Sequence, residues 1–204
     1  MSRTSNSLRI FLILTAFIGG NILFTLPGPG FSNDIYRLIE DESEMEISGR
    51  TNIRSWSARV VISDYDIRSG KNERELPVFS HFTVTMPVET IDSGNSRETG
   101  SIHEYLKADE YPEITFELTS MNNFTSTNGA YETLAEGILT VAGISRNIEV
   151  KGTLQATDDE RIRITGSHEM KMSDFDVETP TALLGAIRAR DDMKVSFDLV
   201  LSPE

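Results

Sequence analysis

Cysteine is absent from all 204 residues of the chain. This absence excludes disulfide bonds, zinc sites with thiolate ligands, thiol catalysis and a lipid anchor on cysteine. Positive charge is scarce, since 19 basic side chains stand against 32 acidic ones and give a formal net charge of −13. Nucleic acids and anionic lipid headgroups repel such a chain, so both are poor partners. The remaining classes are an enzyme without thiol chemistry, a binding protein and a structural domain.

A long uninterrupted apolar run is also missing. Residues 10–26 are mostly apolar, but five polar or glycine residues interrupt them, and a membrane-spanning helix needs about 20 apolar residues. Arg3 and Arg9 precede this run, and Pro27-Gly28-Pro29-Gly30 ends it, which is the pattern of an export signal. We therefore expect residues 1–30 to be a signal peptide that is cleaved rather than kept as an anchor. Residues 31–204 are then a single domain, periplasmic or secreted, with no stable membrane insertion.

From residue 45 onward, apolar and polar side chains alternate, which is typical of strands that bury one face. The longest alternating runs cover residues 147–155, 161–172 and 193–201, and shorter ones cover 56–62, 82–88, 114–118 and 134–141. Turn signals separate the runs at Ser69-Gly70, Ser93-Gly94-Asn95, Asn128-Gly129, Ala142-Gly143 and Asp158-Asp159. Seven or eight such strands must close into a barrel or pack as a sandwich. The predicted fold class is therefore all-β and antiparallel.

Two segments break this alternation. Residues 101–107 are expected to form one or two helical turns before Tyr111-Pro112. Residues 181–190, which follow Pro180, are expected to form a short helix or a packed loop.

The apolar face contains two glycines, Gly152 and Gly166, where a side chain would otherwise stand. They either leave open space inside a barrel or mark a bulge or a bend in its wall. An eight-stranded barrel is just wide enough to fill itself or to hold one small ligand. Met170 and Met172 share this face and suit either a filled core or a tolerant apolar pocket.

Four segments of the chain carry motifs that follow one another in a characteristic order. Tyr111-Pro112-Glu113-Ile114-Thr115-Phe116 forms a YP-x-I-x-F element, and residues 136–146 form a G-x-L-T hairpin. Residues 172–177 contain an M-x-D-F stretch, and residues 48–56 end in Trp56. In this order and spacing the four segments resemble the YceI-like family of exported lipid-binding proteins, residues 48–56 being similar to the opening of one branch of it. The similarity extends from about residue 45 to residue 201. It implies an elongated, lipocalin-like, eight-stranded β-barrel with one or two short helices and an apolar interior for an isoprenoid or fatty chain.

The leading hypothesis is a non-catalytic carrier that binds or sequesters an amphiphilic lipid with a long apolar chain. No cofactor is expected, no nucleic acid is a partner, and a homodimer stays open. The side chains expected to line the tunnel are Trp56, Phe82, Ile114, Phe116, Ile148, Val150, Ile164, Met170 and Phe197. Two alternatives are a structural or interaction module with a filled barrel and an enzyme that acts on an apolar substrate.

Catalytic and metal-binding patterns are weak throughout. His81, His103 and His168 share no ligand spacing, so no metal site is expected. His168 falls on the predicted apolar face, where it is expected to be a hydrogen-bonded interior residue and is the candidate for the enzyme hypothesis. The acidic pairs at residues 64 and 66 and at residues 174 and 176 are expected to be solvated surface.

Overall fold

A computed structural model describes residues 34–71, 77–157 and 160–204, and the proposed signal peptide lies outside these residues. Within the described residues the chain is mostly β-structure, with one α-helix, α1 (Ser96–Tyr105), and three 3-10 turns, η1 (Glu40–Glu42), η2 (Val88–Thr90) and η3 (Met172–Phe175). The strands, in chain order, are β1 (Asp34–Leu38), β2 (Glu44–Thr51), β3 (Ser55–Arg59), β4 (Asp64–Lys71), β5 (Pro77–Pro87), β6 (Glu113–Thr127), β7 (Ala130–Val141), β8 (Ile144–Ala156), β9 (Ile162–Lys171), β10 (Thr181–Ala182) and β11 (Ile187–Pro203). In the part of the chain that the structure describes, no helix is long and apolar enough to cross a membrane.

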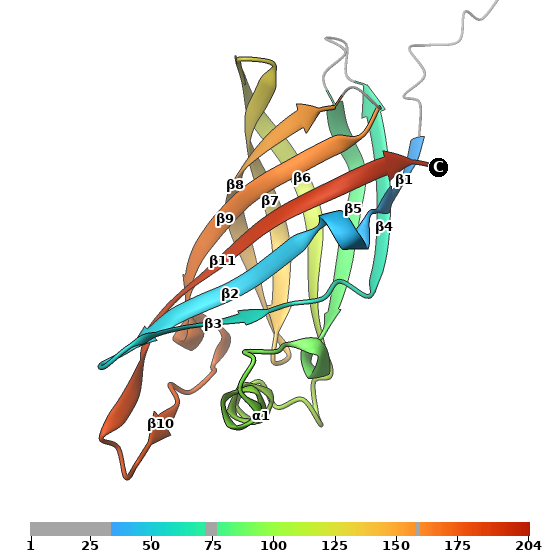
Figure 1. The fold of residues 1–204 in the computed structure, drawn as a ribbon. Helices are drawn as coiled ribbons and strands as arrows, with labels where there is room; N and C mark the ends of the chain where they lie inside the picture. Colours follow the sequence, from blue (N-terminus) through green and yellow to red (C-terminus); the bar gives the residue numbers. More distant parts are fainter. Residues whose placement is uncertain (1–33, 72–76, 158–159) are drawn as a thin grey trace, which may run out of the picture. The chain divides into compact units, whose positions relative to one another are not determined.

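The strands close into an antiparallel barrel (Figure 1). The hydrogen-bonded order β1-β4-β5-β6-β7-β8-β9-β11 returns to β1, because β1 pairs with both β4 and β11. Beyond η1, β2 continues along β11 where β1 leaves it, and β3 pairs with β2 as β4 pairs with β1. The predicted eight-stranded, lipocalin-like barrel is therefore confirmed. Two of its eight strand positions are each occupied by two shorter strands, one by β1 and β2 and the other by β4 and β3.

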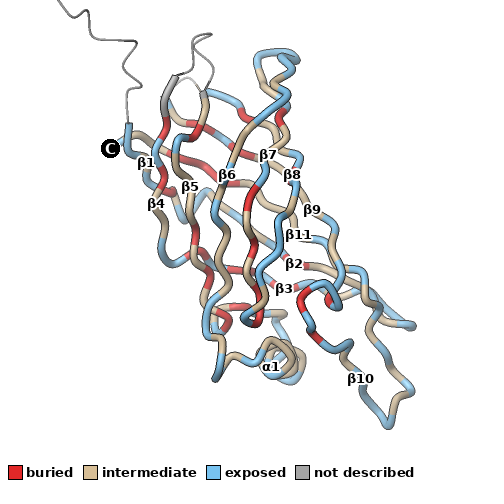
Figure 2. The backbone as a smooth tube through the Cα atoms, turned by 180° about the vertical axis from the view of Figure 1, so that it is seen from behind, coloured by how far each residue is buried: buried red, intermediate tan, exposed pale blue. Residues whose placement is uncertain are grey.

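The period of two places one face of each strand inside the barrel. On β11, Phe197, Leu199 and Leu201 lie opposite Gly166, Ile164 and Ile162 of β9. Leu201 is completely buried, and Figure 2 shows buried residues recurring along the strands. Burial of these apolar faces is the main force that closes the sheet.

One end of the barrel is filled. Leu38 of β1 and Ile162 of β9 flank Leu201, and Ile67 of β4 is 1% exposed in the same core cluster. The other end is covered by α1, none of whose residues is buried (Figure 2). We call the filled end the closed end and the end at α1 the open end.

The segment 181–190 differs from its prediction, because it forms the β10–β11 hairpin and neither a helix nor a packed loop. Thr181 pairs with Arg188, and Ala182 pairs with Ile187. The turn between them holds Leu183 and Leu184 at φ values of 50° and 56°, which a right-handed helix does not contain. The predicted turn at Ser69-Gly70 is also wrong, since both residues lie within β4.

The predicted helix is present but begins earlier than expected, at Ser96 rather than at residue 101. Asn95 is the cause, because its side-chain oxygen accepts hydrogen bonds from the backbone N–H groups of Arg97 and Glu98. Asparagine is among the best residues at this capping position.

The backbone ladder is incomplete at two places in the described barrel wall: between β5 and β6, where pairing ends at Thr83 opposite Glu117 although both strands continue, and between β8 and β9, which we call the split. The backbone pairing of β8 and β9 runs from Ala156 opposite Ile162 to Lys151 opposite Ser167 and stops there, although both strands continue. Two side chains cross the split: His168 donates from Nδ1 to the carbonyl of Glu149 (3.0 Å), and Arg146 donates from Nε to the carbonyl of Asp174 (2.8 Å). Side chains of a second core cluster, which includes Leu139, Met172, Phe175 and Val177, pack at this end of the barrel. The split is therefore closed by side chains rather than by a β-ladder.

Candidate functional site

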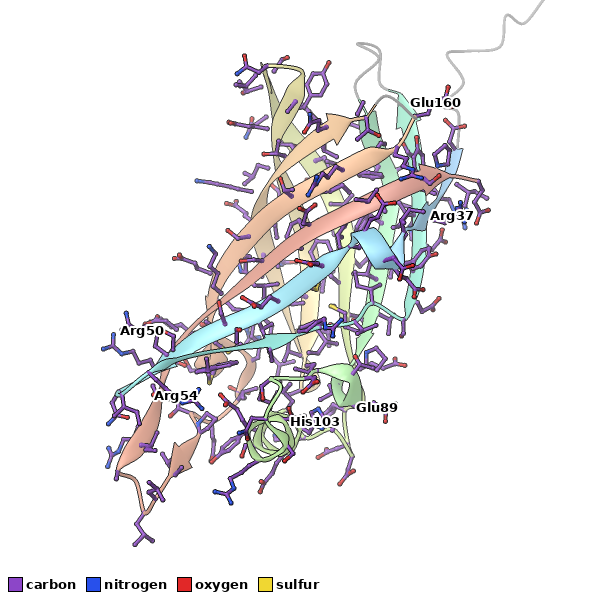
Figure 3. All side chains as sticks on the ribbon, viewed as in Figure 1. Arg37, Arg50, Arg54, Glu89, His103 and Glu160 are labelled. Carbon is purple, nitrogen blue, oxygen red and sulfur yellow. The ribbon has the colours of Figure 1, made fainter. Side chains whose placement is uncertain are left out.

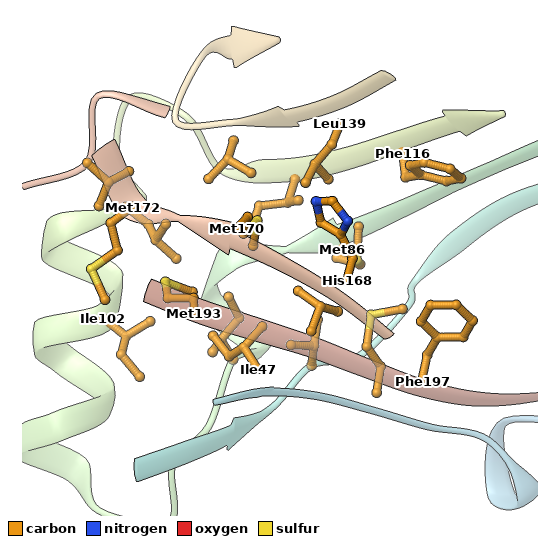
Figure 4. Close-up of a pocket in the computed structure, with 18 of the residues that line it drawn as sticks. Ile47, Met86, Ile102, Phe116, Leu139, His168, Met170, Met172, Met193 and Phe197 are labelled. Atoms are coloured by element: carbon orange, nitrogen blue, oxygen red, sulfur yellow. The ribbon is translucent and has the colours of Figure 1, made fainter. Parts of the chain in front are cut away.

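The barrel encloses an apolar cavity of about 510 Å³. This volume is within the range of small-molecule sites, about 300–1,000 Å³. Its inner wall consists of aliphatic, aromatic and methionine side chains from nearly every strand of the barrel (Figure 4). Residues of α1, of the β2–β3 turn and of the β10–β11 hairpin line its other end, so the cavity leads to the open end of the barrel.

The structure brings all nine predicted tunnel residues to the wall of this cavity. They come from six strands, β3, β5, β6, β8, β9 and β11, and Figure 4 labels three of them. The nine are Trp56, Phe82, Ile114, Phe116, Ile148, Val150, Ile164, Met170 and Phe197. That they contact a ligand remains a prediction.

Three aromatic rings on the cavity wall pack against glycines of neighbouring strands. A Cβ atom on Gly49 would lie 2.8 Å from the Trp56 ring, and one on Gly137 would overlap the Phe116 ring. A Cβ atom on Gly166 would lie 2.5 Å from the Phe197 ring. These glycines let the rings lie flat against the wall instead of filling the barrel, so they preserve the cavity.

The two glycines singled out by the sequence therefore have different roles. The space at Gly166 is occupied by Phe197, so this glycine does not itself leave a gap in the barrel. Gly152, its partner across β8 and β9, lines the cavity, and a Cβ atom there would meet only the Thr165 carbonyl, at 3.4 Å. Only Gly152 matches the interpretation that glycine leaves space.

Inside the barrel, the polar groups on the cavity wall already have hydrogen-bond partners. Thr133 Oγ1 donates to the Asn122 carbonyl at 2.8 Å, and His168 donates from Nδ1 to the Glu149 carbonyl. The imidazole of His168 lies among apolar side chains (Figure 4), which agrees with the predicted role of a hydrogen-bonded interior residue. Among the described residues, no group of three or more histidines and carboxylates is placed to hold a metal.

The open end carries the polar part of the cavity wall, and three contacts connect the elements around it. Arg54 Nη2 of the β2–β3 turn donates to Glu98 Oε2 of α1 at 2.7 Å. Asn52 of the same turn donates from Nδ2 to the Ala186 carbonyl in the β10–β11 hairpin at 3.0 Å. The Thr181 N–H lies 3.5 Å from the hydroxyl of Tyr105, which connects β10 to α1. These contacts form a closed ring of elements around the entrance.

Sequence reasoning missed the contribution of α1 to the cavity. Ile102 and Leu106 lie on its wall, and Arg97 lies at its entrance. The spacing of Ile102 and Leu106, four residues apart, was the available signal, because residues at i and i+4 share one face of a helix. Nothing in the sequence indicates which end of the barrel this face covers.

Asp92 anchors the loop before α1, the helix that lies over the entrance. We expect this anchor to weaken when the Asp92 carboxylate is protonated. Its Oδ1 accepts hydrogen bonds from the Gly94 N–H (2.8 Å) and from Thr99 Oγ1 (3.1 Å), and its backbone pairs with Arg59 of β3. The Gly94 hydrogen bond, followed by that of Thr99, lowers the pKa of the Asp92 carboxyl. A lowered pKa means that the carboxylate stabilises the fold above the ordinary value of about 3.9 and that this contribution is lost as the pH falls through the folded-state value.

We expect the NMR chemical shift of the Gly94 amide, measured between pH 6 and pH 2, to report the protonation of Asp92 with a midpoint below pH 3.9. In Asp92→Asn the acceptor oxygen remains but the proton equilibrium is gone, so this titration should disappear. A midpoint at or above the ordinary aspartate value would contradict the anchoring role of Asp92.

Comparison with known proteins places this architecture. The YceI-like domain model matches residues 36–201. The fold is similar to that of Burkholderia cenocepacia BcnA (TM-score 0.62, 16% identity, covering 80% of this chain and 99% of that one). It is also similar to a polyisoprenoid binding domain from Saccharophagus degradans implicated in plant cell wall breakdown (TM-score 0.60, 13% identity, 84% and 99% coverage). A third similar structure is the Campylobacter jejuni YCEI protein (TM-score 0.54, 18% identity, 96% and 99% coverage). The comparison with curated proteins returned no match.

Proposed function

Because this chain belongs to the YceI-like domain family, we propose that it binds a single long apolar chain, of the isoprenoid or fatty-acid type, in the barrel and carries or sequesters it without catalysis. The observation that carries this proposal is the cavity of about 510 Å³, whose inner wall is mostly apolar and most of whose polar side chains lie at the open end. Such a cavity matches an amphiphile with its chain inside and its headgroup at the entrance. The polyisoprenoid binding of a structural neighbour is a further support.

The energetics of burial support this function. Each buried methylene contributes about 0.8 kcal/mol, so ten buried carbons supply a gross of about 8 kcal/mol. This value corresponds to a micromolar dissociation constant, before the costs of ordering the chain are subtracted. Hydrophobic burial is non-directional, so we expect tolerance of unsaturation along the chain.

The non-catalytic part of the proposal rests on the interior polar groups. His168 is the one titratable side chain on the inner wall of the cavity among the described residues, and its Nδ1 proton is held by a backbone carbonyl. A general base needs a substrate proton within reach and usually a group that orients it. The carbonyl of Glu149 fixes the tautomer of His168, but no carboxylate contact to this ring is present in the described part of the chain.

We further propose that the protein acts outside the cytoplasm. The support is the signal-like pattern of residues 1–30, which lies outside the described residues. Periplasmic or secreted placement also suits a lipid carrier, because an aqueous compartment separates apolar chains from their membranes.

The function is tested by native mass spectrometry and solvent extraction of protein purified from its own host. We expect a co-purifying lipid with one long apolar chain at a stoichiometry of one per barrel. The control is protein that has been unfolded, washed free of lipid and refolded. This lipid-free protein should bind a fluorescent fatty acid. Absence of extractable lipid, together with no uptake of the fluorescent chain by the refolded protein, would favour a filled structural module instead.

A further inference from the structure

Two turns lie side by side at the open end of the barrel and form one surface. Asn52 in the β2–β3 turn donates its backbone N–H to the Arg188 carbonyl and accepts from the Arg188 N–H on Oδ1, both at 3.0 Å. A third hydrogen bond joins Asn52 Nδ2 to the Ala186 carbonyl. We call residues 50–55 and 180–190 together the rim. Because three hydrogen bonds hold its two parts together, the rim presents its side chains as a unit.

The tips of the rim are apolar and exposed. Five large apolar side chains are exposed among the described residues, and three of them belong to the rim: Ile53 (64% exposed), Leu183 (73%) and Leu184, which is fully exposed. The other two, Ile35 and Val61, are isolated from the rim in the sequence. Exposed apolar side chains at the tips of two hydrogen-bonded turns indicate a contact surface.

The backbone conformation of these leucines supports the same conclusion. Leu183 and Leu184 occupy the two central positions of a turn closed by the Gly185 N–H to the Ala182 carbonyl (3.1 Å), both with positive φ. Asparagine and glycine are the favoured residues at these positions of such a turn, because other side chains clash with the backbone there. Two leucines are therefore unfavourable for the turn and gain no burial within the barrel. Their presence is explained by burial against something outside it.

The charge of the rim is opposite to that of the chain. Residues 50–55 and 180–190 contain Arg50, Arg54, Arg188 and Arg190 and no acidic residue, whereas the whole chain has a net charge of −13. Arg54 is paired with Glu98 of α1, so the other three arginines carry the positive charge of the rim. Arg188 reaches back along the hairpin and donates from Nε to the Gly185 carbonyl at 2.9 Å, directly behind the leucines. Figure 3 shows Arg50 and Arg54 at one end of the barrel and Arg37 at the other. Carboxylates adjoin the hairpin part of the rim on both sides, with Glu178 before it and Asp191, which accepts from Ser173, directly after it.

We propose that the rim docks reversibly on a membrane surface that contains anionic lipid, with Leu183, Leu184 and Ile53 inserted among the headgroups and the arginines above them. Exposed leucines at the tip and basic residues behind them are the combination that holds peripheral proteins at such an interface. The inner side of the same hairpin, at Thr181, Ala182 and Ile187, lines the cavity. Docking therefore brings the entrance of the cavity to the lipid surface. The arginines of the rim that are unpaired among the described residues oppose, at this end, the repulsion that the net charge predicts.

A second copy of the chain is a poorer occupant than a membrane. The apolar part of the rim consists of two narrow turn tips, whereas a specific protein interface buries about 1,200–2,000 Å². The proposal goes beyond chain binding, because it concerns where the protein loads and not what it holds.

The test is vesicle flotation of the full chain with phosphatidylcholine alone and with phosphatidylcholine containing phosphatidylglycerol. Wild type should float with the anionic vesicles and much less with the neutral ones. The double variant Leu183→Asn/Leu184→Gly places the favoured residues in the turn, so it should melt at or above the wild-type temperature and bind anionic vesicles at least about tenfold more weakly. Arg50→Gln/Arg190→Gln should reduce binding to the level of neutral vesicles.

Matched control variants lie outside the rim. Ile35→Asn and Arg37→Gln, both on β1, remove one exposed apolar and one basic side chain and should leave flotation unchanged. Wild-type flotation by a stable Leu183→Asn/Leu184→Gly variant would overturn the proposal. A wild-type dimer by light scattering that this variant converts to a monomer would also overturn it and assign the leucines to a second copy. Uptake of a soluble fluorescent fatty acid, measured on the same samples, should be equal in wild type and rim variants, so failure of docking is distinguishable from failure of chain binding.

Discussion

Ile164→Trp should abolish most uptake of an apolar chain while the barrel stays folded. Ile164 lies between Leu154 of β8 and Leu199 of β11, and all three side chains line the cavity. In a filled core, the larger ring would destabilise the protein by about 1–3 kcal/mol. Here the indole enters open space instead, so we expect a melting temperature within about 4 °C of wild type, since 1 kcal/mol shifts a domain of this size by about 2–4 °C. Uptake of a fluorescent fatty acid should fall at least tenfold.

Glu169→Trp is the matched control, because it adds the same ring to an exposed position on the same strand and should change neither property. Ile164→Asp adds a second arm. An unpaired carboxylate in an apolar interior costs several kcal/mol, but water that enters a hollow barrel reduces this cost. We expect a folded Ile164→Asp protein with little chain uptake. A collapsed melting temperature for Ile164→Trp, together with the absence of extractable lipid from wild type, would show that the barrel is filled.

Gly166→Ala should be among the most destabilising single-methyl additions in the protein. The new Cβ atom would lie 2.5 Å from the Phe197 ring and 2.7 Å from the Lys151 carbonyl oxygen, and the second contact involves backbone that cannot rotate away. We expect a loss of about 3 kcal/mol, the upper part of the usual range for overpacking. This corresponds to a melting temperature lower by about 6–12 °C in a domain of this size.

Gly152→Ala is the control on the opposite strand. Gly152 and Gly166 face each other across β8 and β9, yet the nearest atom to a Cβ at position 152 is 3.4 Å away. We expect Gly152→Ala to change the melting temperature little or to raise it, since glycine in a strand costs about 0.5–1 kcal/mol relative to alanine. Equal destabilisation by the two substitutions would mean that Phe197 does not lie against Gly166. Thermal unfolding followed by circular dichroism measures both variants.

The strands with long runs of alternation, such as β8, β9 and β11, could be predicted from the sequence because nearly all of their inner residues are apolar. Sequence reasoning missed β4, whose alternation is short and whose end at Ser69-Gly70 has the composition of a turn. Pairing with β5 keeps these residues in the sheet, and such long-range pairing overrides the local preference. Residues 181–190 were misjudged for a related reason, because their hairpin is held by contacts to Asn52, about 130 positions earlier in the chain.

The cavity residues were easier to predict than the entrance. Alternation alone brings Phe116, Ile148 and Phe197 to one face, and closure of the barrel turns this face inward. The entrance is assembled from a helix and two turns through contacts such as Arg54 to Glu98, 44 residues apart. No short-range pattern encodes such contacts. The basic rim was not predicted either, because the net charge averages over the whole chain and does not report local groups of arginines.

The split between β8 and β9 offers one way for the cavity to widen around a ligand. Where two strands are joined by a full ladder, the wall can widen only by breaking backbone hydrogen bonds, whereas at the split it can widen by rotating the side chains of His168 and Arg146. The depth of the cavity is limited in a different way, because the closed end is filled by side chains such as Leu201, which is completely buried. We therefore expect branched, ring-bearing and straight chains to compete on similar terms, and affinity to reach a plateau at a definite chain length.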